Sequence, residues 1–126
     1  MILDTCFLVD LQRELRKGLS GRATKFLQAH ANASFCISVI SVTEFLEGFA
    51  RTAEGERLLR AYARVDVDSK TAAQAAAIRR SLRLQGNLIG DFDILIAATA
   101  LTESLPLVTR NMAEFSRIEG LELVGY

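Results

Sequence analysis

Short apolar runs alternate with longer segments of helical periodicity along the whole chain, and this alternation limits the possible folds more than any other property of the sequence. Buried strands alternating with helices are typical of a parallel sheet with helices on both faces. We therefore predict a three-layer α/β fold with a parallel sheet of four to five short strands. The predicted strands are Met1–Leu3, Phe35–Ile40, Val65–Val67, Leu107–Thr109 and Leu121–Val124.

The segments between these runs carry apolar residues at helical spacing, and no repeat or linker interrupts them. A chain of 126 residues has the length of one domain, so we expect a single domain over residues 1–126. The predicted helices are Phe7–Lys17, Gly21–Ala31, Val42–Ala50, Glu54–Arg64, Ser69–Leu84 and Ile94–Glu103, followed by a short helical turn at Met112–Phe115.

The charges balance, with 15 Lys and Arg against 15 Asp and Glu. A balanced chain is not expected to coat nucleic acid through net charge alone, although a locally basic surface remains compatible with it. Apolar stretches such as Ile94–Leu101 are shorter than a membrane span. We therefore expect a cytoplasmic protein without a membrane partner, whose Cys6 and Cys36 are buried thiols rather than a disulfide.

Polar residues follow three of the predicted strands at the points where the strands end, and Asp91 and Asp93 open the helix that precedes the strand Leu107–Thr109. Ligand sites of open α/β sheets lie beyond these carboxyl ends, so we expect four side chains to converge there, with Asp91 nearby. They are Asp4, Glu44, Asp93 and Asn111. Clustered carboxylates repel one another unless a cation neutralises them, and an all-oxygen set suits Mg²⁺ or Mn²⁺. Such an ion activates water for phosphodiester hydrolysis.

Each acid also has a simpler structural explanation. Ser41-Val42-Thr43-Glu44 has the spacing of a capping box, which gives Glu44 a role in starting a helix. Asp91 and Asp93 are placed to complement the dipole of the helix that they open, and this explanation is the stronger one for Asp91. Asp4 is harder to explain in this way because a turn after an apolar strand needs no charge.

The motifs that contain these residues resemble the PIN-domain family, specifically its VapC-type toxins from bacterial and archaeal toxin–antitoxin pairs. The resemblance runs from the first predicted strand to the last, in family order. The matching stretches are Ile2–Thr5, Ile37–Phe45, Ile89–Ala100, Leu107–Phe115 and the ending Gly120–Leu121.

This resemblance implies a Mg²⁺-dependent endoribonuclease in which Asp4, Glu44 and Asp93 bind the metal. Asn111 stands where the family often has a fourth acid, so the resemblance supports one metal ion more firmly than two. Cys6 stands where Asn or Ser is more common, and we expect this exchange to remove a polar contact from the site. The remaining candidates orient the acids, accept a proton or meet RNA phosphates, and they are Thr5, Ser41, Asp91, Thr109 and Arg110.

The resemblance also implies partners. Family members cleave RNA, commonly form homodimers, are inhibited by a cognate antitoxin and contact operator DNA only through that antitoxin. The alternative is a catalytically weak or inactive PIN-like module that serves as a partner in a protein or DNA complex, and Cys6 and Asn111 keep it open. A receiver domain ranks lower because Arg110-Asn111 replaces its usual lysine. No G-x-G-x-x-G follows the first strand, which excludes a dinucleotide enzyme.

Overall fold

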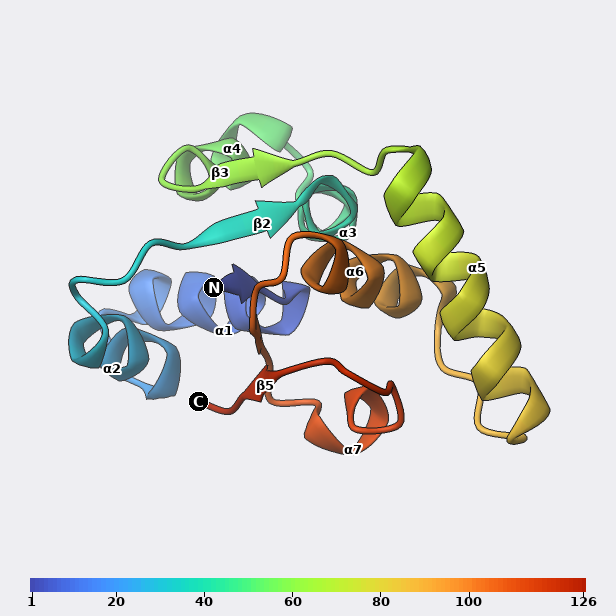
Figure 1. Cartoon of the computed structure of the whole chain (residues 1–126). Helices are drawn as coiled ribbons and strands as arrows, with labels where there is room; N and C mark the ends of the chain where they lie inside the picture. The colour runs from blue at the N-terminus through green and yellow to red at the C-terminus, as the bar shows by residue number, and fades with distance from the viewer.

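The computed structural model describes residues 1–126 and confirms an α/β architecture with a parallel sheet between layers of helices (Figure 1). Seven helices and five strands follow one another along the chain. They are β1 (Ile2–Leu3), α1 (Thr5–Lys17), α2 (Arg22–Ala29), β2 (Cys36–Ser38), α3 (Val39–Glu47), α4 (Thr52–Leu59), β3 (Ala63–Val65), α5 (Ser69–Leu84), α6 (Asp91–Thr102), β4 (Leu107–Val108), α7 (Met112–Phe115) and β5 (Leu123–Val124).

The sheet has the strand order β3-β2-β1-β4-β5, and all neighbouring strands are parallel. β1 is central, with Ile2 in register with Cys36 on one side and with Leu107 on the other. Because every strand points the same way, the carboxyl ends of β1, β2 and β4 lie along one edge. This edge receives the residues that follow each strand.

Successive residues of the strands belong to two separate cores, because the side chains of a strand alternate between its two faces. Ile2 and Leu107 pack in a core with residues of α5, α6 and α7. Leu3 and Val108, one residue further on, pack in a second core with residues of α1, α2, α3 and α4. All four side chains are fully buried, which explains why these strands are continuous apolar runs.

Several predicted element boundaries are wrong. The strand predicted to reach Ile40 ends at Ser38, and α3 begins at Val39 rather than at Val42. Helix α4 ends at Leu59 because the chain has already turned into β3, which lies two residues before its predicted start at Val65. Helix α1 begins at Thr5, two residues earlier than predicted, because Asp4 accepts a hydrogen bond as its N-cap.

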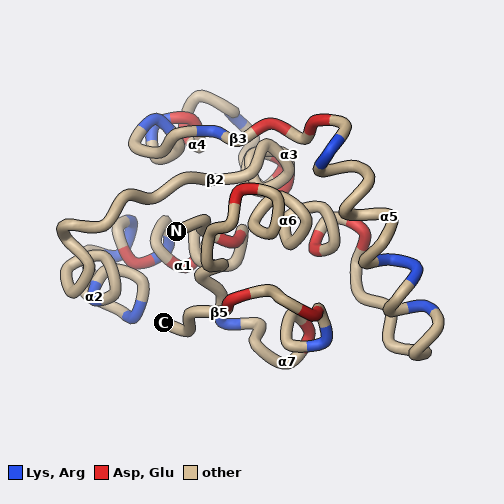
Figure 2. Tube along the Cα trace, viewed as in Figure 1, with Lys and Arg blue, Asp and Glu red and all other residues tan.

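The charged residues are spread unevenly over these elements (Figure 2). Several Lys and Arg residues lie on α2, α4 and α5, towards the outside of the molecule, whereas acidic residues occur near the start of α1, in α3 and at the start of α6. None of the helices is both long and apolar enough to cross a lipid bilayer.

Candidate active site

Asp4 occupies the junction between β1 and α1 at the centre of the sheet edge. Its side chain is buried, and its backbone N–H donates to the carbonyl of Val108 in β4 at 3.0 Å. Its Oδ1 accepts from the N–H of Thr5 and its Oδ2 from the hydroxyl of Thr109, both at 2.7 Å. These bonds fix the orientation of the carboxylate and satisfy part of its hydrogen-bonding capacity despite the burial.

Glu44 reaches the same place from α3. Its Oε2 accepts a hydrogen bond from the hydroxyl of Thr5, whose N–H already binds Asp4. Burial raises the pKa of Glu44, and the charges of Asp4 and Glu47 raise it further, while the bond from Thr5 acts in the opposite direction. Thr5 therefore holds the two carboxylates side by side.

Asp93 comes from the first turn of α6. Burial raises its pKa to about 6, and the nearby charges of Asp4, Glu44 and Glu114 add to this increase. No hydrogen bond contributes to the pKa of Asp93. Its carboxylate is thus half-buried among like charges without a protein group to neutralise it, which is the situation that a bound cation resolves.

The three carboxylates line one pocket of about 580 Å³. Two arginines from different parts of the chain also line it. The full set of lining residues is Asp4, Thr5, Cys6, Val9, Arg13, Glu44, Asp93, Arg110 and Asn111.

The donor set of this pocket fits a hard divalent ion that keeps part of its water shell. No three His, Cys, Asp or Glu side chains stand close enough to form a complete ligand cage. Mg²⁺ does not require such a cage, because it is usually held by one or two carboxylates and several waters. Asp93 and the second oxygen of Glu44 have no protein partner and are available as ligands.

Cys6 makes a polar contact in the site, contrary to our expectation. Its Sγ lies 2.9 Å from Oδ2 of Asp4 and 3.5 Å from the hydroxyl of Thr109. Burial raises the pKa of the thiol, and the charge of Asp4 raises it further. The thiol therefore stays protonated and donates to Asp4, where an Asn or Ser side chain would also act as a donor.

Asn111 lines the pocket but turns its amide towards α7. Its Nδ2 donates to Oε2 of Glu114 at 2.9 Å, and its backbone N–H donates to Thr109. Glu114 was not singled out from the sequence, yet its charge reaches Asp93. The signal was present, because residues three apart on a helical turn share a face. Glu114, three residues after Asn111, therefore places a carboxylate close to the position of Asn111.

Two predicted residues lie elsewhere. Ser41 is inside α3 and not at its start, because Ser38 caps this helix by accepting from the N–H of Ile40. The capping-box explanation of Glu44 is therefore wrong. Ser41 is fully buried and its hydroxyl has no hydrogen-bond partner.

Asp91 does not line the pocket of the three acids, but it lines a neighbouring pocket together with Glu44 and Asp93. Its Oδ1 accepts from Nε of Arg79 at 3.0 Å, and its side chain is 73% exposed. Surface ion pairs of this kind contribute little to stability. The position of Asp91 fits the helix-end role that the sequence favoured for it.

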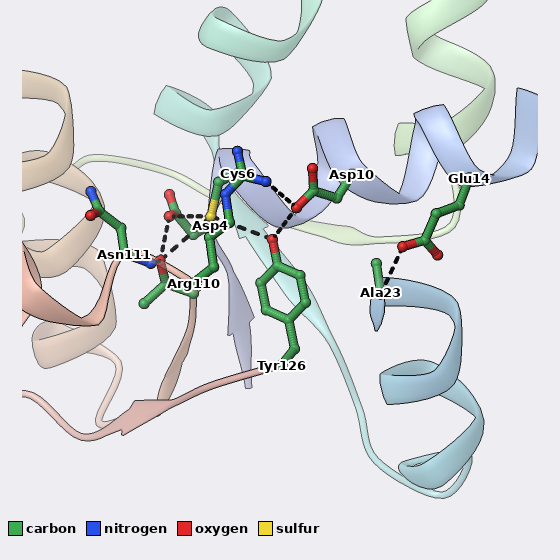
Figure 3. Close-up of polar contacts among 9 residues, drawn as sticks. Asp4, Cys6, Asp10, Glu14, Ala23, Arg110, Asn111 and Tyr126 are labelled. Atoms are coloured by element: carbon green, nitrogen blue, oxygen red, sulfur yellow. Dashed lines mark hydrogen bonds and ion pairs between the residues drawn. The ribbon is translucent and has the colours of Figure 1, made fainter. Parts of the chain in front are cut away.

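Arg110 lines the pocket and lies beside Asp10 and Tyr126 (Figure 3). Its guanidinium forms an ion pair with Asp10 of α1, and the hydroxyl of Tyr126 donates to the same carboxylate oxygen. Arg13, one turn further along α1 than Val9, supplies the second positive charge. Neither Asp10 nor Arg13 was identified from the sequence, because helical spacing alone does not show which face meets the sheet edge.

Comparison with known proteins supports the assignment of the fold. A family model described as PIN domain matches residues 1–121. The tRNA(fMet)-specific endonuclease VapC of Shigella flexneri is 36% identical over 93 residues, which span 68% of this chain and 70% of that protein. Ribonuclease VapC2 of Haemophilus influenzae is 38% identical over 93 residues, with the same coverage.

A solved structure covers nearly the full length of the chain. The structure of VapBC2 from Rickettsia felis, bound to a DNA fragment from their promoter, superposes with a TM-score of 0.84. It is 26% identical and covers 99% of this chain and 97% of that chain. On the match of residues 1–121 and the identity to these relatives, the chain belongs to the PIN-domain family.

Proposed function

We propose that the protein is a Mg²⁺-dependent endoribonuclease of the VapC type, with Mn²⁺ as a substitute, that acts as a toxin and is inhibited by a cognate antitoxin. The observation that carries this proposal is the convergence of Asp4, Glu44 and Asp93 from three distant segments in one pocket. The relatives are named as an endonuclease and a ribonuclease, and one structural neighbour is named as a toxin–antitoxin complex, which supports the same function.

The three acids of the pocket and the threonines bonded to them have separate tasks in this reaction. Asp4, Glu44 and Asp93 bind the metal, while Thr5 and Thr109 fix the orientation of Asp4 and Glu44 by hydrogen bonds. When bound, a divalent ion supplies a water of lowered pKa and neutralises the charge that develops on the phosphate.

The remaining pocket residues serve the substrate and the outer side of the site. Arg110 is placed to bind a phosphate of the RNA, since a guanidinium pairs with phosphate through two parallel N–H donors. Asn111 and Glu114 form a hydrogen-bonded pair beside Asp93, where they orient water.

The decisive experiment compares two substitutions on the same helical turn. Asp93→Asn is expected to abolish both Mg²⁺-dependent RNA cleavage and growth arrest after induced expression. Asp91→Asn is the matched control, because its carboxylate faces Arg79, and it is expected to keep both activities. Full cleavage and growth arrest by the Asp93→Asn protein would contradict the proposal.

The partners are proposed on the same basis. We expect a homodimer, an antitoxin encoded next to this chain, and contact with operator DNA only through that antitoxin. Co-expression of the antitoxin should relieve growth arrest, and the Asp93→Asn protein should still co-purify with it. Sequencing RNA ends after induction will identify the substrate. Tight partner binding by a wild-type protein that cleaves no RNA would instead favour an inactive PIN-like module.

A further inference from the structure

Arg110 lines the same pocket as three carboxylates without pairing with any of them. It lines the same pocket as Asp4, Glu44 and Asp93, yet its one ion pair is with Asp10, at 2.5 Å. A free guanidinium beside three carboxylates is strongly attracted to them, particularly where burial lowers the effective dielectric. An Arg110 that folded onto these acids would occupy the oxygens that a metal ion needs.

Asp10 is itself held in place by a third residue. The hydroxyl of Tyr126 donates to Oδ2 of Asp10 at 2.8 Å, while its distance to the sulfur of Cys6 is 3.6 Å (Figure 3). Burial, together with the contacts to Cys6 and Asp10, raises the pKa of Tyr126, so the hydroxyl stays protonated and remains a donor. The ring of Tyr126 packs edge-on against Phe7 with the centroids 4.7 Å apart.

The two ends of this ion pair differ in exposure. The side chain of Asp10 is 19% exposed, whereas that of Arg110 is 52% exposed. Arg110 uses Nη1 for Asp10, and a guanidinium has five N–H donors in all. Asp10 is therefore largely enclosed by the protein. The remaining N–H donors of Arg110 are free for a ligand at the pocket.

We propose that Asp10 is a positioning residue, fixed by Tyr126, that holds Arg110 off the carboxylates so that they remain available for metal while Arg110 receives an RNA phosphate. This inference rests on the proposed function for the identity of the ligands. The carboxylate of Asp10, in α1, then acts on the metal site through Arg110 and touches neither the metal nor the substrate.

Mn²⁺ binding to the purified protein without RNA, measured by calorimetry, is the primary test. Asp10→Asn keeps the shape of the side chain and removes its charge, so Arg110 turns to the acids and Mn²⁺ affinity falls about tenfold. The double variant Asp10→Asn/Arg110→Gln removes the competing cation and restores Mn²⁺ affinity to at least the wild-type level. A loss of folding alone would not be reversed by a second substitution, so the restoration distinguishes positioning from structural damage.

Two further variants sharpen this test. Tyr126→Phe removes one hydrogen bond from Asp10 but keeps its charge, so Mn²⁺ affinity should fall by a smaller factor, about twofold. Glu56→Gln breaks another ion pair, with Arg64, on a different part of the surface, and should leave Mn²⁺ affinity unchanged. With RNA and saturating metal, Asp10→Asn should raise KM more than it lowers kcat.

The outcomes separate this inference from the proposed function. Unchanged Mn²⁺ affinity in Asp10→Asn, or a double variant as weak as Asp10→Asn, overturns the inference and leaves the nuclease proposal intact. Restored affinity in the double variant without any RNA cleavage by the wild type supports the inference for the metal and contradicts the nuclease proposal. A wild-type protein that binds no Mn²⁺ overturns both.

Discussion

Asp4 and Asp93 carry the same functional group but differ in what holds them. Asp4 accepts hydrogen bonds from Thr5 and Thr109 and caps α1, so it serves folding as well as the site. No hydrogen bond contributes to the pKa of Asp93, and like charges raise it. An inactive variant is therefore made more cleanly at Asp93 than at Asp4, since Asp93 has fewer native contacts to lose.

The raised pKa of Asp93 gives a stability prediction with a defined sign. A folded-state pKa of about 6, above the ordinary value of 3.8, means that the folded state binds this proton more tightly than the unfolded state. The metal-free protein therefore loses stability as pH rises from about 4 to about 6. Asp93→Asn removes this loss and should raise Tm by about 2–4 °C at pH 7.5.

Thermal unfolding of both proteins in a chelating buffer checks this sign. At pH 4 the two Tm values should converge, because Asp93 is then largely protonated in the folded protein. Added Mn²⁺ should raise the Tm of the wild type more than that of Asp93→Asn, since ligand binding stabilises the folded state by mass action. A lower Tm for Asp93→Asn at pH 7.5 would contradict the repulsion described above.

Glu114 is predicted to act from α7 on the proposed metal site. Glu114→Gln removes one of the charges that raise the pKa of Asp93. The acid limb of the pH–rate profile should therefore move to lower pH. The Mg²⁺ concentration for half-maximal cleavage should rise several-fold, because the pocket loses negative charge. Glu119→Gln, an exposed acid just after α7, is the control and should change neither quantity.

At the level of elements, hydrophobic periodicity predicted whether a segment is a strand or a helix better than it predicted where that segment begins. Ser38 is the only hydroxyl residue in the otherwise apolar run Phe35–Ile40, and Val39 and Ile40 continue the β-branched pattern, so periodicity does not show that the strand ends at Ser38. The position of this boundary depends on hydrogen bonds that only the folded chain forms, such as the cap from Ser38 to Ile40. Ser41 was misplaced for this reason, whereas Glu44 still reaches the pocket because α3 extends past it.

Glu14 provides a test of one element alone. It caps α2 from α1, accepting from the N–H groups of Ala23 and Thr24 and from the hydroxyl of Thr24, while the N-cap residue Gly21 has no side chain to do so. Glu14→Ala should lower the free energy of unfolding by about 1–2 kcal/mol. Urea unfolding measures this loss, and RNA cleavage at 25 °C should be unchanged, because Glu14 does not line the acid pocket.

At the level of the whole molecule, balanced charge predicts weak dependence of RNA binding on salt. The pocket offers Arg13 and Arg110 to phosphates, so the slope of log K against log salt should be roughly −1.4 for single-stranded RNA, at about −0.7 per contact. Filter binding with the Asp93→Asn protein measures this slope, and adding Arg110→Gln should reduce it by about 0.7. A slope steeper than about −4 would indicate a large basic surface instead.

The sequence predicted more of the acid cluster than of its surroundings. Asp4 and Glu44 were predicted together because the parallel sheet brings strand ends to one edge, and Asp93 was added because it opens the helix that precedes β4. Asp10, Arg13, Glu114 and Tyr126 were not, because their roles depend on how helices and the chain end pack against that edge. Which helix face meets the pocket is decided by three-dimensional packing and not by spacing along the chain.

The order of strands in the sheet has a consequence for protein synthesis. β1 is translated first but needs β4, more than 100 residues later, as its second neighbour. A ribosome that has completed α5 has produced Asp4 and Glu44 but neither Asp93 nor β4. Under the proposed function, a nascent chain that ends before α6 therefore lacks one of the three metal-binding acids and cannot cleave RNA.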